Sequence, residues 1–111
     1  MAEYVPLKGD FIAVTFDPQS GHEQCGRRPA LVVSNDLFNK HTGLSIVCPI
    51  TNARRGYPFH VPIPENQNVT GSVMVEQVKS IDFRARRARC IGRAPEQVLL
   101  EVLSLLDACV Y

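Results

Sequence analysis

The chain has 111 residues, of which 45% are hydrophobic and 21% are charged, and its formal net charge is +1. This length predicts one domain over residues 1–111, and no window approaches the roughly 18 apolar residues of a membrane-spanning helix. Because the first residues lack a basic segment followed by an apolar one, we expect no secretory signal and a cytoplasmic protein.

The cysteine pattern argues against a metal centre. Four cysteines are scattered without a C-x-x-C pair or a histidine at ligand spacing: Cys25, Cys48, Cys90 and Cys109. We therefore expect reduced thiols, no disulfide framework, no bound metal and no cofactor.

Positive charge is concentrated in the middle of the chain. Residues 24–94 contain eleven Lys and Arg but only four Asp and Glu, whereas both ends are acidic. A basic central body suits a polyanionic partner such as nucleic acid. Arginine-rich strands also form solvated faces and dimer contacts, so charge alone does not decide the function.

The first half of the chain predicts strands and one short helix. Aromatic and β-branched residues at 11–16 indicate a strand, and the apolar residues at 30–34 indicate a second. Residues 36–40 form a short helix that Ser34-Asn35 can cap and Thr42-Gly43 can stop. A third strand is expected at 44–50, with Pro49 causing its end or a bulge.

The second half predicts further strands and one long helix. Residues 57–63 contain two prolines and suit an edge strand, and 71–78 alternate as a half-buried strand. Residues 80–84 are ambiguous between a turn and one helical turn, and 85–91 alternate as a last strand. Pro95 begins a helix whose apolar residues recur at i, i+3, i+4 and i+7. The wide apolar stripe suggests that this helix packs on the sheet and also against another subunit.

The stretch from Asp17 to Asn35 looks most like a functional site. A turn-rich loop leads into Glu23-Gln24-Cys25-Gly26-Arg27-Arg28-Pro29, and an apolar strand follows directly. Pro29 favours an extended Arg28, so a guanidinium stands at the start of a rigid strand with Glu23 on the loop before it. A solvated ion pair of little consequence is the ordinary alternative.

The run E-Q-x-G-x-R-P before an apolar strand resembles the MazF family of toxin ribonucleases, which includes PemK/Kid and ChpB. Four further segments match the family pattern: Gly9-Asp10, Pro49-Ile50-Thr51, Gly56-Tyr57-Pro58-Phe59, and Gly71 to Ser80 with its Q-V-K-S core. The resemblance extends from about residue 4 to residue 105. It implies a mainly β, SH3-like barrel with a C-terminal helix and one or two short helices, working as a homodimer.

The resemblance also implies a sequence-specific, metal-independent endoribonuclease that cleaves single-stranded RNA. The substrate's 2′-hydroxyl would attack the phosphate, leaving a 2′,3′-cyclic phosphate and a 5′-hydroxyl. A cognate antitoxin of the MazE/PemI type, acidic and partly disordered, would be the partner protein.

Metal-free cleavage needs a base, a cation for the phosphorus oxygens and a group that holds the phosphate. The resemblance assigns these roles to Glu23, Arg28 and Thr51 respectively. His22 could replace Glu23 as base, whereas His41 and His60 are expected to be bystanders. Thr51 has an alternative role, since a threonine at a strand end commonly caps a turn.

The remaining candidates are expected to bind RNA, and they are Gln24, Arg55, Gln77, Lys79 and Arg86. Each has a structural alternative: Gln77 and Lys79 can stabilise a loop, Arg86 can form a dimer contact, and Arg55 can be solvated. Two rival functions remain. One is a toxin of similar fold that binds DNA gyrase without catalysis, although such toxins lack the Glu/Arg/Thr set. The other is a nucleic-acid-binding β-barrel without turnover.

Overall fold

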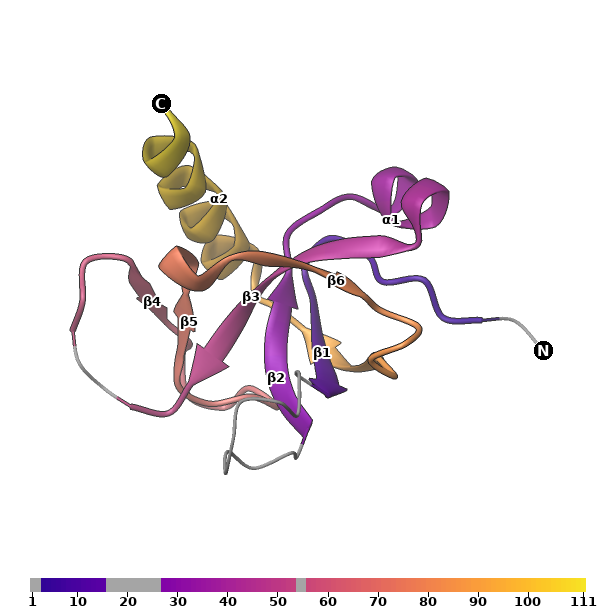
Figure 1. The fold of residues 1–111 in the computed structure, drawn as a ribbon. Coiled ribbons are helices and arrows are strands. Elements are labelled where there is room, and N and C mark those ends of the chain that lie inside the picture. The colour runs from indigo at the N-terminus through magenta and orange to yellow at the C-terminus, as the bar shows by residue number, and fades with distance from the viewer. Residues whose placement is uncertain (1–2, 16–26, 54–55) are drawn as a thin grey trace, which may run out of the picture.

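The structure, a computed structural model, describes residues 3–15, 27–53 and 56–111. Within these ranges the chain forms mostly short antiparallel strands and ends in one long helix (Figure 1). The elements are β1 (Asp10–Thr15), β2 (Arg27–Val32), α1 (Asp36–Thr42), β3 (Leu44–Thr51), β4 (His60–Pro62), β5 (Ser72–Met74), the 3-10 helix η1 (Val75–Gln77), β6 (Lys79–Asp82), β7 (Arg89–Arg93) and α2 (Glu96–Val110). The predicted mainly β domain with a C-terminal helix is confirmed.

Strand β3 connects the two parts of the sheet. The strands follow the order β4-β5-β3-β2-β1-β7, and β6 also pairs with β3. One edge of β3 pairs with β2, while the other pairs with β6 at residues 44–47 and with β5 at residues 50–51. Every pairing among the described strands is antiparallel, and three of the pairings, β1–β2, β2–β3 and β4–β5, join strands that are consecutive in the chain.

Pro49 does not end β3 or cause a bulge, contrary to the expectation from the sequence. The strand continues to Thr51, and Pro49 is the register partner of Ala30 in β2. On the other edge, Pro49 lies between the segments that pair with β6 and β5. A residue in that gap is not required to donate a ladder hydrogen bond to either strand, which is why proline is tolerated there.

The two faces of the sheet bury different apolar clusters, as strand alternation requires. One cluster is centred on Phe11, Leu31 and Cys48 and includes Val98 and Val102 of α2. The helix therefore covers this face, as predicted from its apolar stripe (Figure 1). The second cluster consists of Ile12, Val14, Ala30, Val32, Val47 and Ile81.

Two expected strands are wrong in their bounds. The segment 71–78 is not one strand, because β5 ends at Met74 and η1 leads into β6. This turn lets Val73 and Val75 both enter the core while the chain moves from one segment of β3 to the next. Residues 83–87 form turns, so the last strand begins at Arg89 instead of residue 85, and it includes Gly92.

The helix ends follow the predicted signals. The Asn35 side chain accepts a hydrogen bond from the Phe38 backbone N–H, and Gly43 ends α1 with a φ of 74°. Pro95 is the residue before α2, one position earlier than expected. Among the described residues, no helix combines the length and apolar character needed to cross a membrane.

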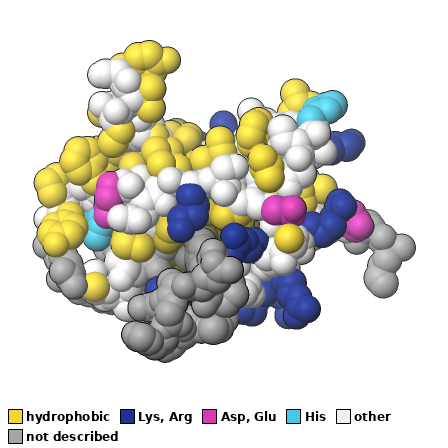
Figure 2. Space-filling view, viewed as in Figure 1, with side chains coloured by type: hydrophobic (Ala, Val, Ile, Leu, Met, Phe, Trp, Pro, Cys, Tyr) yellow, Lys and Arg dark blue, Asp and Glu magenta, His cyan; other side chains and the backbone are white. Residues whose placement is uncertain are grey.

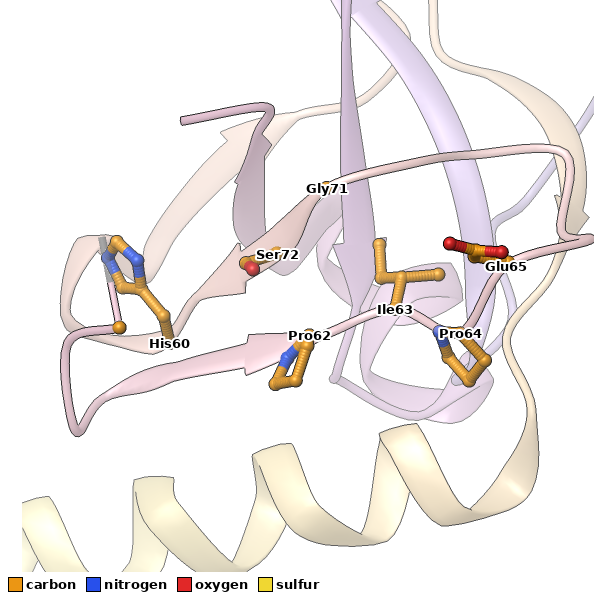
Figure 3. A pocket seen from close by; sticks show the side chains of 8 residues that line it. His60, Pro62, Ile63, Pro64, Glu65, Gly71 and Ser72 are labelled. Carbon is orange, nitrogen blue, oxygen red and sulfur yellow. The ribbon is translucent and has the colours of Figure 1, made fainter. Parts of the chain in front are cut away.

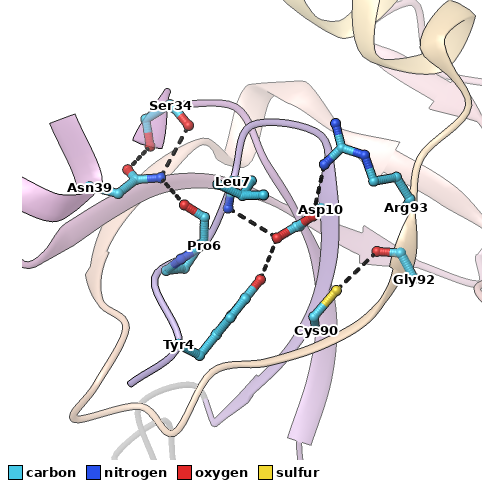
Figure 4. Close-up of polar contacts among 9 residues, drawn as sticks. All are labelled: Tyr4, Pro6, Leu7, Asp10, Ser34, Asn39, Cys90, Gly92 and Arg93. Atoms are coloured by element: carbon cyan, nitrogen blue, oxygen red, sulfur yellow. Dashed lines mark hydrogen bonds and ion pairs between the residues drawn. The ribbon is translucent and has the colours of Figure 1, made fainter. Parts of the chain in front are cut away.

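A buried carboxylate ties the N-terminal arm to the sheet (Figure 4). Asp10 is 3% exposed and accepts hydrogen bonds from the Tyr4 hydroxyl at 2.5 Å and the Leu7 N–H at 3.0 Å. Its other oxygen lies 2.8 Å from Arg93 Nη1. These contacts anchor residues 4–10 against β1 and β7, so the Gly9-Asp10 motif opens the first strand from a fixed position.

Candidate functional site

The structure brings Arg28 of β2 and the loop that follows Thr51 of β3 to the border of one cleft. Ala30 pairs with Pro49 in the β2–β3 ladder, and both candidate residues lie two positions beyond that pair. Beyond that pair, β2 continues along β1, with Arg28 opposite Val14, and β3 continues along β5, with Thr51 opposite Ser72. Arg28 is exposed and Thr51 is half-buried. The cation and the hydroxyl thus lie near the diverging ends of two paired strands (Figure 1).

The neighbouring arginine has a different role. Arg27 donates to the Ala13 carbonyl at 2.8 Å, to Thr15 Oγ1 at 3.3 Å and to the Arg87 carbonyl. Its guanidinium therefore connects β2 to β1 and to the turn before β7. Arg27 is thus tied into the scaffold.

The loop after β3 holds Thr51 in place. Thr51 Oγ1 accepts a hydrogen bond of 3.1 Å from the Ala53 N–H, so the side chain does cap a turn. A hydroxyl has two acceptor lone pairs and one hydrogen, so this bond leaves the hydrogen available to a phosphate oxygen. Capping and phosphate binding are therefore compatible.

Gly71 allows the backbone of the next strand to approach Thr51. Its φ is +112°, and a Cβ built on it would lie 2.1 Å from the Thr51 carbonyl oxygen. Only glycine fits such a contact and such a backbone conformation. The neighbouring Thr70 hydroxyl donates to Asn52 Oδ1 at 3.0 Å, which fixes the same loop from a second point.

Three of the candidate RNA-binding residues lie around this region. Lys79 begins β6 as the register partner of Val47, two positions after Gln77 of η1, and both side chains are exposed. Arg86 is half-buried, and its backbone accepts a hydrogen bond of 3.0 Å from the Thr15 N–H. Arg86 thus borders the end of β1, whose last residue, Thr15, pairs with Arg27.

The other candidates, His22, Glu23, Gln24 and Arg55, lie outside the described residues. The segment that contains the first three joins two register partners, Thr15 and Arg27. Glu23 precedes Arg28 by five residues, so chain length alone keeps their Cα atoms within about 18 Å.

A cleft of about 320 Å³ borders the candidate residues. Arg28 lines it from β2, and Asn52 lines it next to Thr51; Asn68 and Thr70 belong to the opposite loop. Ligand pockets begin at about this size. Sequence reasoning missed Asn68 and Thr70, although their polar segment Glu65 to Thr70 separates two predicted strands.

Lys and Arg side chains are spread over the centre and right of the face drawn in Figure 2, with few acidic ones among them. Such a surface attracts a polyanion and raises its association rate. Within the described ranges, no three His, Cys, Asp or Glu side chains are grouped to hold a metal ion. Metal independence stays a prediction.

Comparison with known proteins places these features in a family. A family model described as "PemK-like, MazF-like toxin of type II toxin-antitoxin system" matches residues 7–110. The endoribonuclease toxin MazF of Escherichia coli K12 is 45% identical over 101 residues, which are 90% of each chain. The endoribonuclease toxin ChpB of the same organism is 46% identical over 108 residues, 93% of this chain and 92% of its own.

Solved structures agree with the sequence relatives. A chain of the MazE-MazF crystal structure from Deinococcus radiodurans superposes with a TM-score of 0.90 at 44% identity, over 97% of both chains. A crystal structure of MazF alone from the same organism gives a TM-score of 0.87, over 97% of this chain and 98% of that one.

Proposed function

The chain belongs to the PemK-like, MazF-like toxins of type II toxin–antitoxin systems, and we propose that it stops growth by cutting single-stranded RNA in the cytoplasm without a metal ion. Its curated relatives are endoribonucleases. Unpaired RNA is the proposed substrate because its bases can be turned outward to be read, whereas paired bases cannot. The observation that carries the proposal is that Arg28 and the loop after Thr51 border one cleft.

The proposed reaction is an internal transesterification. Glu23 takes the proton of the 2′-hydroxyl, and that oxygen forms a bond to phosphorus. The bond between phosphorus and the 5′-oxygen breaks, and the 5′-oxygen takes up a proton for which Arg28 is the proposed donor. The products are a 2′,3′-cyclic phosphate and a 5′-hydroxyl.

Arg28 and Thr51 would act on the phosphate itself. The planar guanidinium of Arg28 suits the two phosphate oxygens that gain charge in the transition state. The Thr51 hydroxyl donates its remaining hydrogen to a phosphate oxygen. Because both residues lie on paired strands, the two donors need little reorganisation at the moment of reaction.

The flanking nucleotides would lie on the polar residues around this centre. We assign phosphate or base contacts to Gln24, Arg55, Gln77, Lys79 and Arg86. The described members of this group support the assignment by lying next to β3 or at the end of β1.

The proposed partners are a second copy of the chain and an acidic, partly disordered antitoxin. Exposed apolar side chains on α2, among them Leu100 at 56% and Val110 at 73%, support a homodimer. The basic face in Figure 2 suits an acidic inhibitor. In the relatives from Deinococcus radiodurans, MazF is crystallised with MazE.

The test is incubation of the purified protein with a long unstructured RNA in EDTA, with cuts mapped by primer extension. We expect discrete cuts at a shared short motif, and no cuts when the nucleotide at the scissile bond carries 2′-deoxyribose. Cleavage of the deoxy substrate would rule out the mechanism. Intact RNA after incubation with a folded, antitoxin-free protein would favour the gyrase-binding or binding-only alternatives, which a supercoiling assay separates.

A further inference from the structure

A second cavity lies on the far side of β5 from Thr51. It has a volume of about 320 Å³ and is lined mainly by residues of β4, the loop after it and the start of β5 (Figure 3). Its polar side chains are those of His60, Glu65 and Ser72, and its apolar walls include Pro62 and Ile63. Proline and isoleucine walls with a few polar groups are typical of a small-ligand or nucleobase pocket.

His60 contains a buried polar atom without a partner. Its side chain is only 6% exposed, and Nε2 lies 3.1 Å from Glu76 Oε2. The other ring nitrogen, Nδ1, is buried and has no hydrogen-bond partner. Since such atoms are rare and destabilising in folded proteins, a buried nitrogen without a partner in a residue that lines a cavity is a candidate acceptor for a donor of a ligand.

The partner of Nε2 determines what Nδ1 can accept. An ionised carboxylate only accepts hydrogen bonds, so Nε2 must carry the proton that points to Glu76. In the neutral imidazole, Nδ1 is then an acceptor and needs a donor from the ligand. The Tyr57 ring packs edge-on at 5.0 Å between centroids and limits rotation of the imidazole.

The pocket adjoins the candidate cleavage centre through the sheet. Ser72 pairs with Thr51 on one side and with Pro62 on the other. Since neighbouring strands are about 4.8 Å apart, the pocket begins one strand beyond Thr51. A nucleotide next to the scissile phosphate therefore lies within reach of it.

We propose that this pocket receives a nucleobase flanking the scissile phosphate and reads its exocyclic amino group through His60 Nδ1. Adenine, cytosine and guanine carry such an amino group and uracil does not, so the pocket discriminates against uracil at one position. Glu65 and the Ser72 hydroxyl offer further acceptors on the same cavity. This assignment rests on the proposed function, because it takes RNA as the substrate.

The first experiment compares cut sites in a randomised RNA pool for the native protein and His60→Phe. Phenylalanine fills the space of the imidazole but has no acceptor. We expect one position next to the cut where the native protein disfavours uracil about tenfold, the scale of one unsatisfied hydrogen bond. His60→Phe should lose that preference and keep the others.

The second experiment removes the amino group from the substrate instead. At the identified position, adenosine is replaced by purine riboside, or guanosine by inosine. The native protein should lose about tenfold in kcat/KM, and His60→Phe should lose nothing further. Glu76→Gln is the matched control: it keeps an acceptor for Nε2 and leaves the pocket intact, so the base preference should remain.

The outcomes separate the pocket from the cleavage mechanism. An unchanged base profile in folded His60→Phe would overturn the pocket while leaving the ribonuclease function intact. If the native protein cuts nothing, binding of short RNAs with and without the amino group is measured by fluorescence anisotropy. Binding that depends on both His60 and the amino group would support the pocket without cleavage, and its absence would overturn both proposals.

If His60→Phe fails to fold, as judged by circular dichroism, Ser72→Ala tests the opposite wall. Ser72 is half-buried at the cavity, and alanine preserves the strand. Ser72→Ala is expected to weaken the base preference at the same position, and an unaltered profile would count against the pocket.

Discussion

The adjacent residues Arg27 and Arg28 of β2 are expected to have different roles. Arg27 donates to two backbone carbonyls and one hydroxyl of the surrounding strands and turn. Arg28, one residue later, borders the same cleft as Arg27, and the resemblance gives the role at the phosphate to Arg28. A one-residue step along a strand reverses the face, so residues of the same type acquire different tasks.

The first prediction uses this pair of arginines. Arg28→Ala is expected to lower kcat by about 10²-fold or more, the scale for loss of one preorganised stabilising donor. Arg27→Ala is the matched control, and we expect it to be destabilised by about 1–3 kcal/mol because it leaves carbonyls without donors. Thermal unfolding and single-turnover cleavage of both variants measure the two effects. Full activity in folded Arg28→Ala would remove Arg28 from the site.

At the scale of elements, β3 sets the geometry. It presents Thr51 at its end and pairs with β2, β5 and β6, so the strands that carry Arg28, Ser72 and Lys79 are all its neighbours. The close approach at Gly71 is part of this arrangement, because the β5 backbone touches the Thr51 carbonyl. A small change at Gly71 is therefore expected to move the end of β3 that carries Thr51.

The second prediction compares Gly71→Ala with Gly43→Ala. Both glycines have a positive φ, but a Cβ on Gly43 would meet nothing within 4 Å, whereas one on Gly71 would contact the Thr51 backbone. Gly43→Ala should cost about 1–2 kcal/mol of stability from the backbone conformation alone and retain activity. Gly71→Ala should cost more and lower the cleavage rate as well. If chemical denaturation gave the same loss of stability for both variants, and both cleaved RNA at the same rate, this account of the Gly71 contact would be wrong.

The sequence predicted the existence of most elements better than their ends. The caps of α1 and the apolar stripe of α2 are local signals, and both predictions hold. The division of 71–78 into β5, η1 and β6 was not predictable, because alternation at Val73 and Val75 is the same for one strand or for two. The prediction that Pro49 ends the strand or causes a bulge was wrong. Whether a strand tolerates a proline depends on which strands pair beside it, and this pairing is visible only in the tertiary structure.

The candidate site was predictable in part. The motif around Arg28 and the P-I-T segment marked two residues by resemblance, but only the folded chain brings Arg28 and the loop after Thr51 to one cleft. The His60 pocket had no sequence signal, and His60 was expected to be a bystander. An unpartnered ring nitrogen depends on the distant Glu76 and on the cavity wall, so it becomes visible only in three dimensions.

For the whole molecule, titration of buried groups limits stability at high pH. Burial raises the pKa of the Cys48 thiol to about 12, with a smaller contribution from the Glu76 carboxylate. Burial, together with the hydrogen bond to Asp10, also raises the pKa of the Tyr4 phenol. Both shifts favour the neutral form in the folded protein.

The third prediction is that the free energy of unfolding falls as the pH rises above about 9. Between the thiol's pKa of 9.0 in the unfolded chain and about 12 in the folded one, only the unfolded chain loses the proton, so it binds fewer protons. The slope is then negative, at most about 1.4 kcal/mol per pH unit for each group. Urea denaturation between pH 8 and 10.5 measures it.

Cys48→Ala should flatten this pH dependence, and Cys109→Ala should not, because Cys109 is exposed. The same difference gives a chemical check, since a thiol reagent at pH 8 should label Cys90 and Cys109 in the folded protein and Cys48 only after unfolding. A flat stability profile up to pH 10.5 would contradict the raised pKa of Cys48.

The arrangement around β3 has a consequence for how such toxins diverge. The hairpin of β4 and β5 joins β3 through only two register pairs, Ile50 with Val73 and Thr51 with Ser72. The groups proposed to do chemistry lie on other segments of the chain, whereas the residues that line the proposed His60 pocket lie mostly on this hairpin and its loop. Exchange of residues 57–70 between relatives would therefore alter which RNA is cut without rebuilding the machinery that cuts it. The part that reads the base and the part that cleaves the RNA are therefore separable, and a new RNA target can arise by exchange of one short segment.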